Sequence, residues 1–368
     1  MEEEVKKKKK LSPWKIVLIC VGGFLAFVLT VAGGFLIFAA ATELKPDAYN
    51  HLCVTGTHSK TLATTDTVSL LSWNTGYSTL DENADFFLDG GTQVRASSQS
   101  AVIKNMDEMS EEINALNPDI VFLQEVDSNS DRSRRYNEVT GFRNNLGLDK
   151  YQSSYALNYK AGYVPYPFPK TLGKVESGLV SFSKYEVKDA QRIQLPIPFS
   201  WPLSMINLKR CLLVSRVGFT DSSKELVLVN LHLEAYDDGE GKAKQTNMLK
   251  EFIQSEYEKG NYVIASGDFN QTFSNVDLTN YPTYGNNWKS PIIDVNEFSH
   301  VSCIMDNTHP TCRLLDKPYK NADKSTFQYY MIDGMIVTDN IHVNSVETKN
   351  LNFKNSDHNP VLMEFSFN

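Results

Sequence analysis

The chain has 368 residues, of which 41% are hydrophobic and 22% charged, so it can bury a core and is not disordered as a whole. Five cysteines are too few for a small disulfide-stapled scaffold, and no C-x-x-C pair is present for a zinc ribbon or a thioredoxin-type site. The formal net charge is −8. Residues 1–45 carry seven lysines and four glutamates, a net of +3, which leaves −11 on the rest. This acidic remainder argues against a surface made for tight, sequence-independent binding of duplex DNA.

The N-terminal segment has the pattern of a membrane anchor. Residues 1–15, with lysines at 6–10 and 15, are predicted to be a cytoplasmic basic tail, and the uncharged residues 16–41 a transmembrane helix. At ~1.5 Å per residue this helix exceeds the ~30 Å hydrocarbon core of a bilayer. The flanking lysines predict a single-pass protein of the cell membrane with the rest of the chain extracytoplasmic. A signal peptide cleaved near residues 39–41 is the alternative, but signal sequences have apolar regions of only about 7–15 residues.

The remaining chain is predicted to be a stalk over residues 42–64 and one folded domain over residues 65–368. Apolar runs predict strands at 68–73, 119–123, 179–182, 212–219, 226–233, 262–265, 331–337 and 361–365, and helical spacing predicts helices at 102–116 and 249–257. Strands interleaved with helices predict an α/β (α+β) layered sheet core with helices outside, in which the strands near 212–233 are antiparallel.

Two segments rich in proline and aromatic residues, 151–169 and 195–202, are predicted to be loops. Their aromatic side chains would stack nucleic-acid bases, rest on a lipid interface, or pack against one another. The basic pair Lys209 and Arg210 is predicted to be solvated, with contact to a phosphate as the alternative. In an oxidising compartment, Cys303 and Cys312 are predicted to form a local disulfide, with Cys211 a buried free thiol.

Polar residues follow or interrupt six of the predicted strands. Strand ends on one rim of a sheet bring distant residues together, so these clusters are predicted to converge. Each cluster alone also fits a turn, a loop cap or a core histidine, and it is their joint order that indicates a site. Carboxylates, carboxamides and imidazoles can neutralise a phosphate ester and position a water for attack, and oxygen ligands favour Mg²⁺ or Mn²⁺ over zinc. The clusters are Asn74, Gln124 with Glu125, His232, Asp268 with Asn270, Asp333, and Asp357 with His358.

In chain order the motifs are Ser-Trp-Asn, Leu-Gln-Glu, Leu-His-Leu, Gly-Asp-Phe-Asn, Ile-Asp-Gly and Ser-Asp-His-Asn-Pro. This order resembles the endonuclease/exonuclease/phosphatase superfamily, with its deoxyribonuclease-I-like fold, over about residues 67–368. The resemblance is to a membrane-anchored bacterial-type member. It implies a four-layer α/β/β/α sandwich of two mixed sheets and a metal-dependent hydrolase of ester bonds, namely a phosphodiesterase, phosphatase or nuclease.

The resemblance also implies roles for individual residues. Glu125 would be the principal ligand of Mg²⁺ or Mn²⁺, with Asn74 helping to hold the site and Asp357 binding a second metal or tuning the first. Asp268 would orient or deprotonate the attacking water. Asn270 would donate hydrogen bonds to the oxygens of the transition state.

Four further residues complete the implied catalytic set. His358 would contact the scissile phosphate and be held in its tautomer by Asp333. His232 would be a general acid for the leaving group. Glu176 stands where some relatives carry a partner for that histidine, and it also fits an ordinary surface glutamate.

The substrate is left open by the sequence. An anchored phosphoesterase acting on a lipid headgroup or a similar phosphodiester or phosphomonoester is favoured, because the chain has an anchor and an acidic net charge. A cell-surface nuclease acting on DNA or RNA is the alternative. A catalytically silent binding module of the same fold is a third hypothesis. Phosphate-ester substrate and membrane are thus the predicted partners, and no obligate protein partner is evident.

Overall fold

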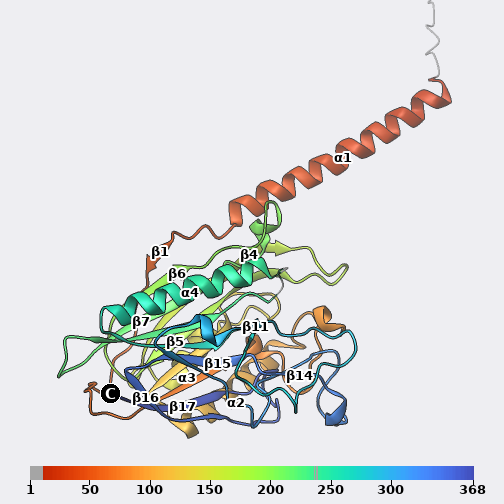
Figure 1. Cartoon of the computed structure of the whole chain (residues 1–368). Helices are drawn as coiled ribbons and strands as arrows, with labels where there is room; N and C mark the ends of the chain where they lie inside the picture. Colours follow the sequence, from red (N-terminus) through yellow and green to blue (C-terminus); the bar gives the residue numbers. More distant parts are fainter. Residues whose placement is uncertain (1–10, 236, 238) are drawn as a thin grey trace, which may run out of the picture.

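The computed structural model describes residues 11–235, 237 and 239–368, so the lysines at 6–10 lie outside the described residues. Two large mixed sheets form its centre (Figure 1). The first, called sheet A, has the order β1 (Tyr49–His51), β6 (Val187–Gln194), β7 (Cys211–Gly218), β8 (Glu225–His232), β9 (Tyr262–Asp268), β15 (Asp333–Thr338) and β12 (Val301–Ile304). The second, sheet B, has the order β16 (Ile341–Thr348), β17 (Val361–Phe367), β2 (Val68–Asn74), β3 (Ile120–Asp127), β5 (Gly173–Ser183) and β4 (Gln152–Val164).

Helices cover the outer faces of the two sheets. The helices α2 (Gln99–Leu116) and α3 (Glu138–Leu146) pack on sheet B, and α4 (Glu240–Glu258) packs on sheet A. Figure 1 shows α4 and α2 on opposite sides of the sheets. Two short pairs, β10 (Thr272–Phe273) with β11 (Ile292–Ile293) and β13 (Cys312–Arg313) with β14 (Tyr329–Tyr330), lie outside the two sheets. The predicted four-layer sandwich is therefore confirmed.

The strands in the middle of each sheet are apolar runs because both of their faces are buried. In β3, Phe122 packs between the sheets while Leu123 packs under α2 and α3. In β8, Leu228 packs between the sheets while Val229 packs under α4. A strand covered on both faces needs apolar side chains at successive positions, so its sequence does not alternate.

The prediction of a loop over residues 151–169 is wrong, because its first part forms the long edge strand β4 (Gln152–Val164). The three prolines of this segment, at 165, 167 and 169, all follow the strand, so they interrupt no hydrogen bond within it. Exposure within β4 changes along the strand, as befits an edge strand with one covered face. Residues 195–202 hold no strand or helix, as predicted.

The predicted transmembrane helix is α1 (Pro13–Thr42), which is long and apolar enough to cross a membrane. Residues 42–64, predicted to be a stalk, bond to the domain over much of their length. Strand β1 pairs antiparallel with β6, and Thr55, Lys60 and Leu62 form single bridges to Ser153, Tyr185 and Phe219. The connection from the helix to the domain is therefore short.

The predicted disulfide between Cys303 and Cys312 is wrong, because both residues are free thiols in the structure. Cys303 belongs to β12 and packs in the core under α4, whereas Cys312 belongs to β13 and packs with Tyr330 and Ile332. Nine positions of chain separate them, but they join different clusters. Burial raises the pKa of each thiol to about 12.

A buried asparagine joins the two sheets next to the candidate site. Asn230 of β8 donates from Nδ2 to the carbonyl oxygens of Leu123 and Val180 in sheet B, at 3.2 and 2.9 Å, and its Oδ1 accepts from Gln124 Nε2 at 2.8 Å. The Asn230 side chain is fully buried, so water cannot replace these bonds.

We expect Asn230→Leu to lower the free energy of unfolding by about 2–4 kcal/mol, because it leaves buried polar groups without partners. Urea unfolding followed by circular dichroism measures the change. Asn344→Leu, at an exposed position of β16, is the matched control and should change stability by less than about 0.5 kcal/mol. Equal effects of the two substitutions would contradict this role for Asn230.

Candidate active site

One edge of the two sheets collects the polar residues predicted from the sequence. In sheet A, β8 and β9 are parallel and place His232 opposite Asp268, and β15 is antiparallel to β9 and places Asp333 opposite Asp268 as well. In sheet B, the parallel strands β2 and β3 place Asn74 opposite Gln124. This rim, which is formed by the ends of these strands and not by an outermost strand, is called the catalytic edge below.

A hydrogen-bonded group crosses from one sheet to the other at this edge. Asn74 of sheet B donates from Nδ2 to Asp268 Oδ2 of sheet A at 3.0 Å. His358, in the loop before β17, joins this group. Its Nδ1 lies 2.8 Å from Asp333 Oδ2, and its Nε2 lies 3.8 Å from Asp268 Oδ2. His232 Nε2 lies 3.3 Å from the same Asp268 oxygen. Two imidazoles and one amide thus surround one carboxylate.

Burial controls the protonation of Asp268. Its side chain is about 3% exposed, and burial together with the nearby Asp333 raises its pKa to about 7. The His358 ring, the backbone amide of Asn270 and the Asn74 amide oppose this shift by favouring the charged form. A carboxylate with a pKa near neutral is a stronger base than an ordinary aspartate.

The two histidines differ in charge because their neighbours differ. Burial opposes protonation of His358, yet Asp333, Cys312 and Asp357 outweigh it and hold its pKa well above the ordinary value. Burial lowers the pKa of His232 well below the ordinary value, and Arg210, His358 and Arg132 lower it further. The surroundings therefore favour the charged form of His358 and the neutral form of His232.

Glu125 is directed out of β3 by an irregularity in the strand. The pairing of β3 with β5 shifts register between Leu123 and Val126, and Glu125 has a φ of 58°. A bulge of this kind re-aims a side chain, and a positive φ at a non-glycine residue is held only by its surroundings. The residue is partly exposed while its neighbours are buried, and Glu125 Oε1 lies 3.9 Å from His232 Nδ1.

Glu125 and Asp357 bring two carboxylates to the same end of the cleft. Burial raises the pKa of Asp357 to about 6; the His358 charge opposes this, and Glu125 adds to it. Asn74, at the end of the neighbouring strand β2, accepts the backbone N–H of Gly76 at its Oδ1 at 3.1 Å. Repelling carboxylate oxygens beside an amide oxygen suit a hard divalent cation, which would relieve the repulsion. These residues therefore fit a site for a divalent cation.

Two other groups of residues close by could hold a metal ion. The members of each group approach one another within 4.8 Å and all are buried. The groups are Asp268, Asp333 and His358, and Cys312, Asp357 and His358. The first is already joined by the hydrogen bond between Asp333 and the His358 ring.

The polar residues open into a cleft of about 400 Å³. Glu125, His232, Asp268, Asn270 and His358 line its polar end. Apolar side chains also line the cleft, among them Phe86, Phe87, Leu88, Leu208, Leu314 and Leu315. One cavity therefore joins groups that handle a phosphate to a surface that would accept a hydrocarbon or an aromatic group.

The sequence of this chain matches the model of the Endonuclease/Exonuclease/phosphatase family over residues 71–358. The chain belongs to this family. Its members are metal-dependent phosphoesterases and nucleases, so the protein is a metal-dependent hydrolase of phosphate esters. A comparison with curated proteins gave no match.

Solved structures of the endonuclease/exonuclease/phosphatase fold resemble this one. The protein from Beutenbergia cavernae is 16% identical, with a TM-score of 0.57, and the alignment covers 82% of this chain and 72% of that one. The protein from Bacteroides vulgatus is 18% identical, with a TM-score of 0.51, and the alignment covers 82% of this chain and all of that one. At these identities the likeness establishes the fold.

Three arginines line the cleft of this endonuclease/exonuclease/phosphatase protein, and the sequence did not single them out as a group. Arg132 forms two hydrogen bonds with Asp127, and Arg313 donates to the backbone oxygen of Asp81 at 2.8 Å. The prediction that the pair at 209–210 is solvated is wrong, since both side chains are buried. Arg210 lines the cleft, and its Nε has no hydrogen-bond partner among the described residues.

Three predicted site residues do not line the cleft. Asn74 and Asp333 bond to Asp268 and His358, which do line it, whereas Glu176 makes its ion pairs elsewhere. Its carboxylate lies 2.9 Å from Lys174 Nζ and 3.8 Å from Lys160 Nζ, both on the β4–β5 ribbon. The carboxylate nearest to Nδ1 of His232 is that of Glu125. A signal for this difference was present in the sequence, since lysine two positions before Glu176 shares its face of the strand.

We expect Glu176→Gln to keep turnover within about threefold of wild type, because a half-exposed ion pair contributes about 0–1 kcal/mol. Steady-state kinetics on a soluble aryl phosphodiester measures the change. A loss of a hundredfold or more would return Glu176 to the catalytic set.

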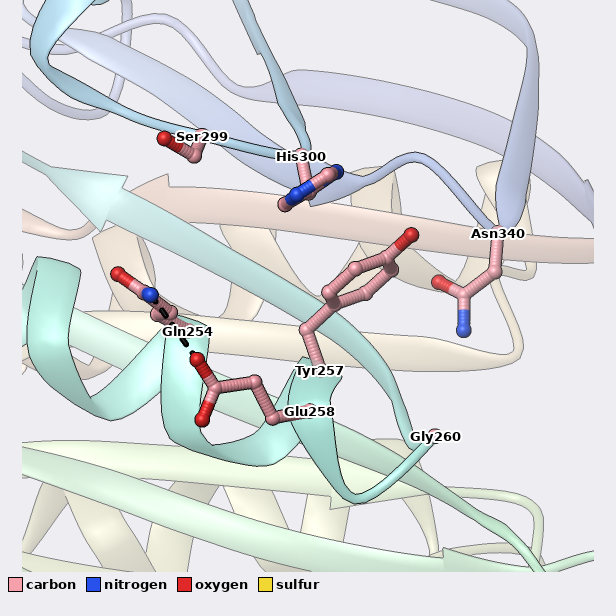
Figure 2. A pocket seen from close by; sticks show the side chains of 7 residues that line it. All are labelled: Gln254, Tyr257, Glu258, Gly260, Ser299, His300 and Asn340. Carbon is pink, nitrogen blue, oxygen red and sulfur yellow. Dashed lines mark hydrogen bonds between the residues drawn. The ribbon is translucent and has the colours of Figure 1, made fainter.

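A second cavity, of about 520 Å³, lies at the opposite end of sheet A from the catalytic edge. Figure 2 shows Tyr257 and His300, which both line it and whose rings stack with centroids 5.0 Å apart. Gln254 donates to Glu258 on the same helix at 2.9 Å. The residues that line this cavity include none of the predicted site residues.

Proposed function

We propose that the protein is a membrane-anchored, extracytoplasmic phosphodiesterase that uses Mg²⁺ or Mn²⁺ to hydrolyse the headgroup ester of a lipid. The observation that carries this proposal is the cleft with a phosphate-handling end and an apolar wall. An amphiphilic phosphodiester matches both ends, whereas a nucleic-acid backbone offers repeated charge to a domain that is itself acidic. The anchor helix α1 gives the domain a membrane to act on.

The metal site is proposed on Glu125, Asp357 and Asn74. A divalent cation held there would neutralise charge on the phosphate oxygens and polarise the scissile bond. The other contacts with the phosphate would be made by side chains of the protein. Arg210, which is buried and lines the cleft, would bind a phosphate oxygen.

Hydrolysis in this proposal begins with a water next to Asp268. Asp268 accepts a proton as the water oxygen bonds to phosphorus, and the P–O bond to the alcohol breaks on the opposite side. His358, held as a cation by Asp333, binds an equatorial phosphate oxygen, and Asn270 donates from Nδ2 to another. The same Asn270 Nδ2 donates to the Leu233 carbonyl oxygen at 3.0 Å, which fixes the amide and leaves its second hydrogen for substrate.

His232 takes a different part from the one expected for a general acid. Because its lowered pKa keeps the ring neutral near pH 7, it has no excess proton to give. We propose that its ring N–H donates a hydrogen bond to the departing oxygen as the P–O bond breaks. The alkoxide that leaves takes its proton from water in the cleft, and Asp268 afterwards returns the proton of the attacking water to solvent.

The test is a substrate panel with the full-length protein in detergent micelles and in vesicles. Choline and glycerol phospholipids, sphingomyelin, phosphoinositides, plasmid DNA and RNA are each incubated with Mg²⁺, Mn²⁺ or EDTA. We expect metal-dependent release of a phosphorylated headgroup from a lipid, at a rate at least about tenfold above nucleotide release. Faster cleavage of DNA or RNA would overturn the lipid assignment in favour of a nuclease. Binding without turnover of any substrate would favour a silent module.

A further inference from the structure

We propose that two apolar loops at the catalytic edge rest on the surface of the bilayer that α1 crosses. The loops are residues 163–169, which include the last two residues of β4 and lead toward β5, and residues 197–203, between β6 and β7. The partner is a phospholipid surface. The inference rests on the proposed function in one respect, namely that α1 lies in a membrane.

The two loops gather the exposed apolar side chains of the domain. After α1, the described residues include eleven large exposed apolar side chains, and six of them lie on these loops. They are Tyr163, Tyr166, Phe168, Ile197, Trp201 and Leu203. Phe168 is 88% exposed and Trp201 69% exposed, values at which a side chain contributes little to the stability of the fold. Clustered exposure of this kind marks an interaction surface.

The two loops leave the same edge of the molecule as the catalytic residues. Strand β5 is antiparallel to β3 and places Ser177 opposite Asp127, so the loop before β5 lies at the end of β3 that carries Glu125. Strand β6 runs in the same direction as β8, through β7, so the loop after β6 lies at the end of β8 that carries His232.

The end of α1 is fixed to the domain beside these loops. Gly162 packs against α1 so closely that a Cβ there would lie 2.5 Å from Thr42 Oγ1 and 2.8 Å from Phe38 Cζ. Lys209 is buried and pairs with Glu43 at 3.1 Å, and it also donates to the carbonyl oxygen of Ser204. In Figure 1 the green turn around residues 203–206 lies at the base of α1. The surface is thus continuous with the proposed transmembrane segment.

The composition of the loops suits a membrane surface. Tyrosine and tryptophan are favoured at the level of the lipid headgroups, where an apolar ring and a polar tip are both satisfied. Neither loop contains an aspartate or glutamate, in a domain that is strongly acidic elsewhere. Lys170, which follows the first loop, would face anionic lipid. A soluble protein partner is less well matched, because the end of a membrane-spanning helix stands beside the surface.

The surface also meets the apolar wall of the cleft. Phe87 lines the cleft, and its ring lies 5.6 Å from that of Tyr166 in the first loop. Leu208, which also lines the cleft, follows the second loop. A lipid would therefore pass from the bilayer along apolar side chains to the catalytic residues without its hydrocarbon part crossing water.

Depth-dependent fluorescence quenching tests the contact without relying on turnover. In full-length Trp14→Phe/Trp288→Phe, the remaining tryptophans are Trp201 and the buried Trp73. The protein is reconstituted in phosphatidylcholine–phosphatidylglycerol vesicles with or without lipids brominated near the headgroup end of the chains. We expect about a twofold loss of the Trp201 signal in brominated vesicles.

The matched control moves the reporter to the other end of sheet A. Adding Trp201→Phe and Tyr257→Trp to the same parent places a partly exposed tryptophan beside His300, in the cavity of Figure 2. This reporter should not be quenched. If Trp201 were quenched no more than the Tyr257→Trp reporter, the membrane contact would be refuted, whether or not any lipid is a substrate.

A second arm measures the effect on catalysis. In Phe168→Ser/Trp201→Ser, hydrolysis of the lipid substrate in the enzyme's own vesicles should fall about tenfold or more, while hydrolysis of bis(4-nitrophenyl) phosphate in detergent should stay within about twofold of wild type. Equal losses on both substrates would mean that the loops shape the cleft itself and would overturn the proposal. Unchanged rates on both would overturn it as well.

Discussion

Asp268→Asn should lower turnover by about 10²–10⁴-fold while leaving the fold intact, because it removes the proposed proton acceptor for the attacking water and little volume. A soluble aryl phosphodiester serves as substrate, and circular dichroism checks the fold. The matched control is Asp277→Asn, at an exposed position in the loop after β10. Turnover within tenfold of wild type would contradict the role of Asp268.

The same substitution should raise the thermal stability of the metal-free protein. A carboxyl group whose pKa is about 7 in the folded state and about 3.9 in the unfolded state binds its proton more tightly when folded. Its contribution to the free energy of unfolding is therefore fully present below about pH 4 and is lost as the pH rises through about 7. An asparagine does not titrate, so the Asp268→Asn variant does not lose this part of the free energy of unfolding as the pH rises.

We therefore expect Asp268→Asn to raise the midpoint of thermal unfolding at pH 8 in EDTA by several degrees relative to wild type, with a smaller difference at pH 5. The gain is limited because the carboxylate accepts hydrogen bonds from Asn74 and from the backbone of Asn270, and an amide can accept only one of them through its oxygen. Differential scanning calorimetry measures the midpoint of thermal unfolding of both proteins at the two pH values. A variant less stable than wild type at both pH values would contradict the raised pKa of Asp268.

Glu125→Gln should abolish the response to Mg²⁺ at concentrations that saturate the wild type and weaken metal binding by at least about 10–100-fold. The isosteric amide keeps the shape of the bulge in β3 but removes the charge of Glu125, so that only the carboxylate of Asp357 remains to bind the cation. Calorimetric titration of Mn²⁺ into the full-length protein measures affinity independently of turnover.

Glu186→Gln, at an exposed position between β5 and β6, is the matched control for charge and should bind Mn²⁺ as the wild type does. Wild-type affinity in Glu125→Gln would place the cation elsewhere. The buried group of Asp268, Asp333 and His358 would then be the first alternative.

The strands and the convergence of the site were predictable because most candidate site residues lie within, or directly beside, an apolar run. Asp268 and Asp333 stand at the ends of strands that are otherwise mostly buried, and a charged group in such a run must lie where other polar groups can satisfy it. Sequence alone therefore indicates the edge on which the site lies.

What the sequence did not reveal depends on contacts between distant segments. The burial of Arg132 follows from its pairing with Asp127 and from its place 3.7 Å over the ring of Tyr77. The ion pair of Glu176 with Lys160 follows from the register between β4 and β5. Local composition predicts neither of these two contacts. In the same way, β4 was missed because prolines that follow a strand look, in a window of sequence, like prolines inside it.

The short connection between α1 and the domain has a kinetic consequence. Only residues 43–48 separate the helix from β1, a reach of at most about 20 Å. With α1 in a bilayer, as we propose, the enzyme meets its substrate by lateral diffusion within one leaflet. Its rate should follow the mole fraction of substrate among the surrounding lipids rather than the amount per volume of solution, and diluting the vesicles in buffer should leave it unchanged.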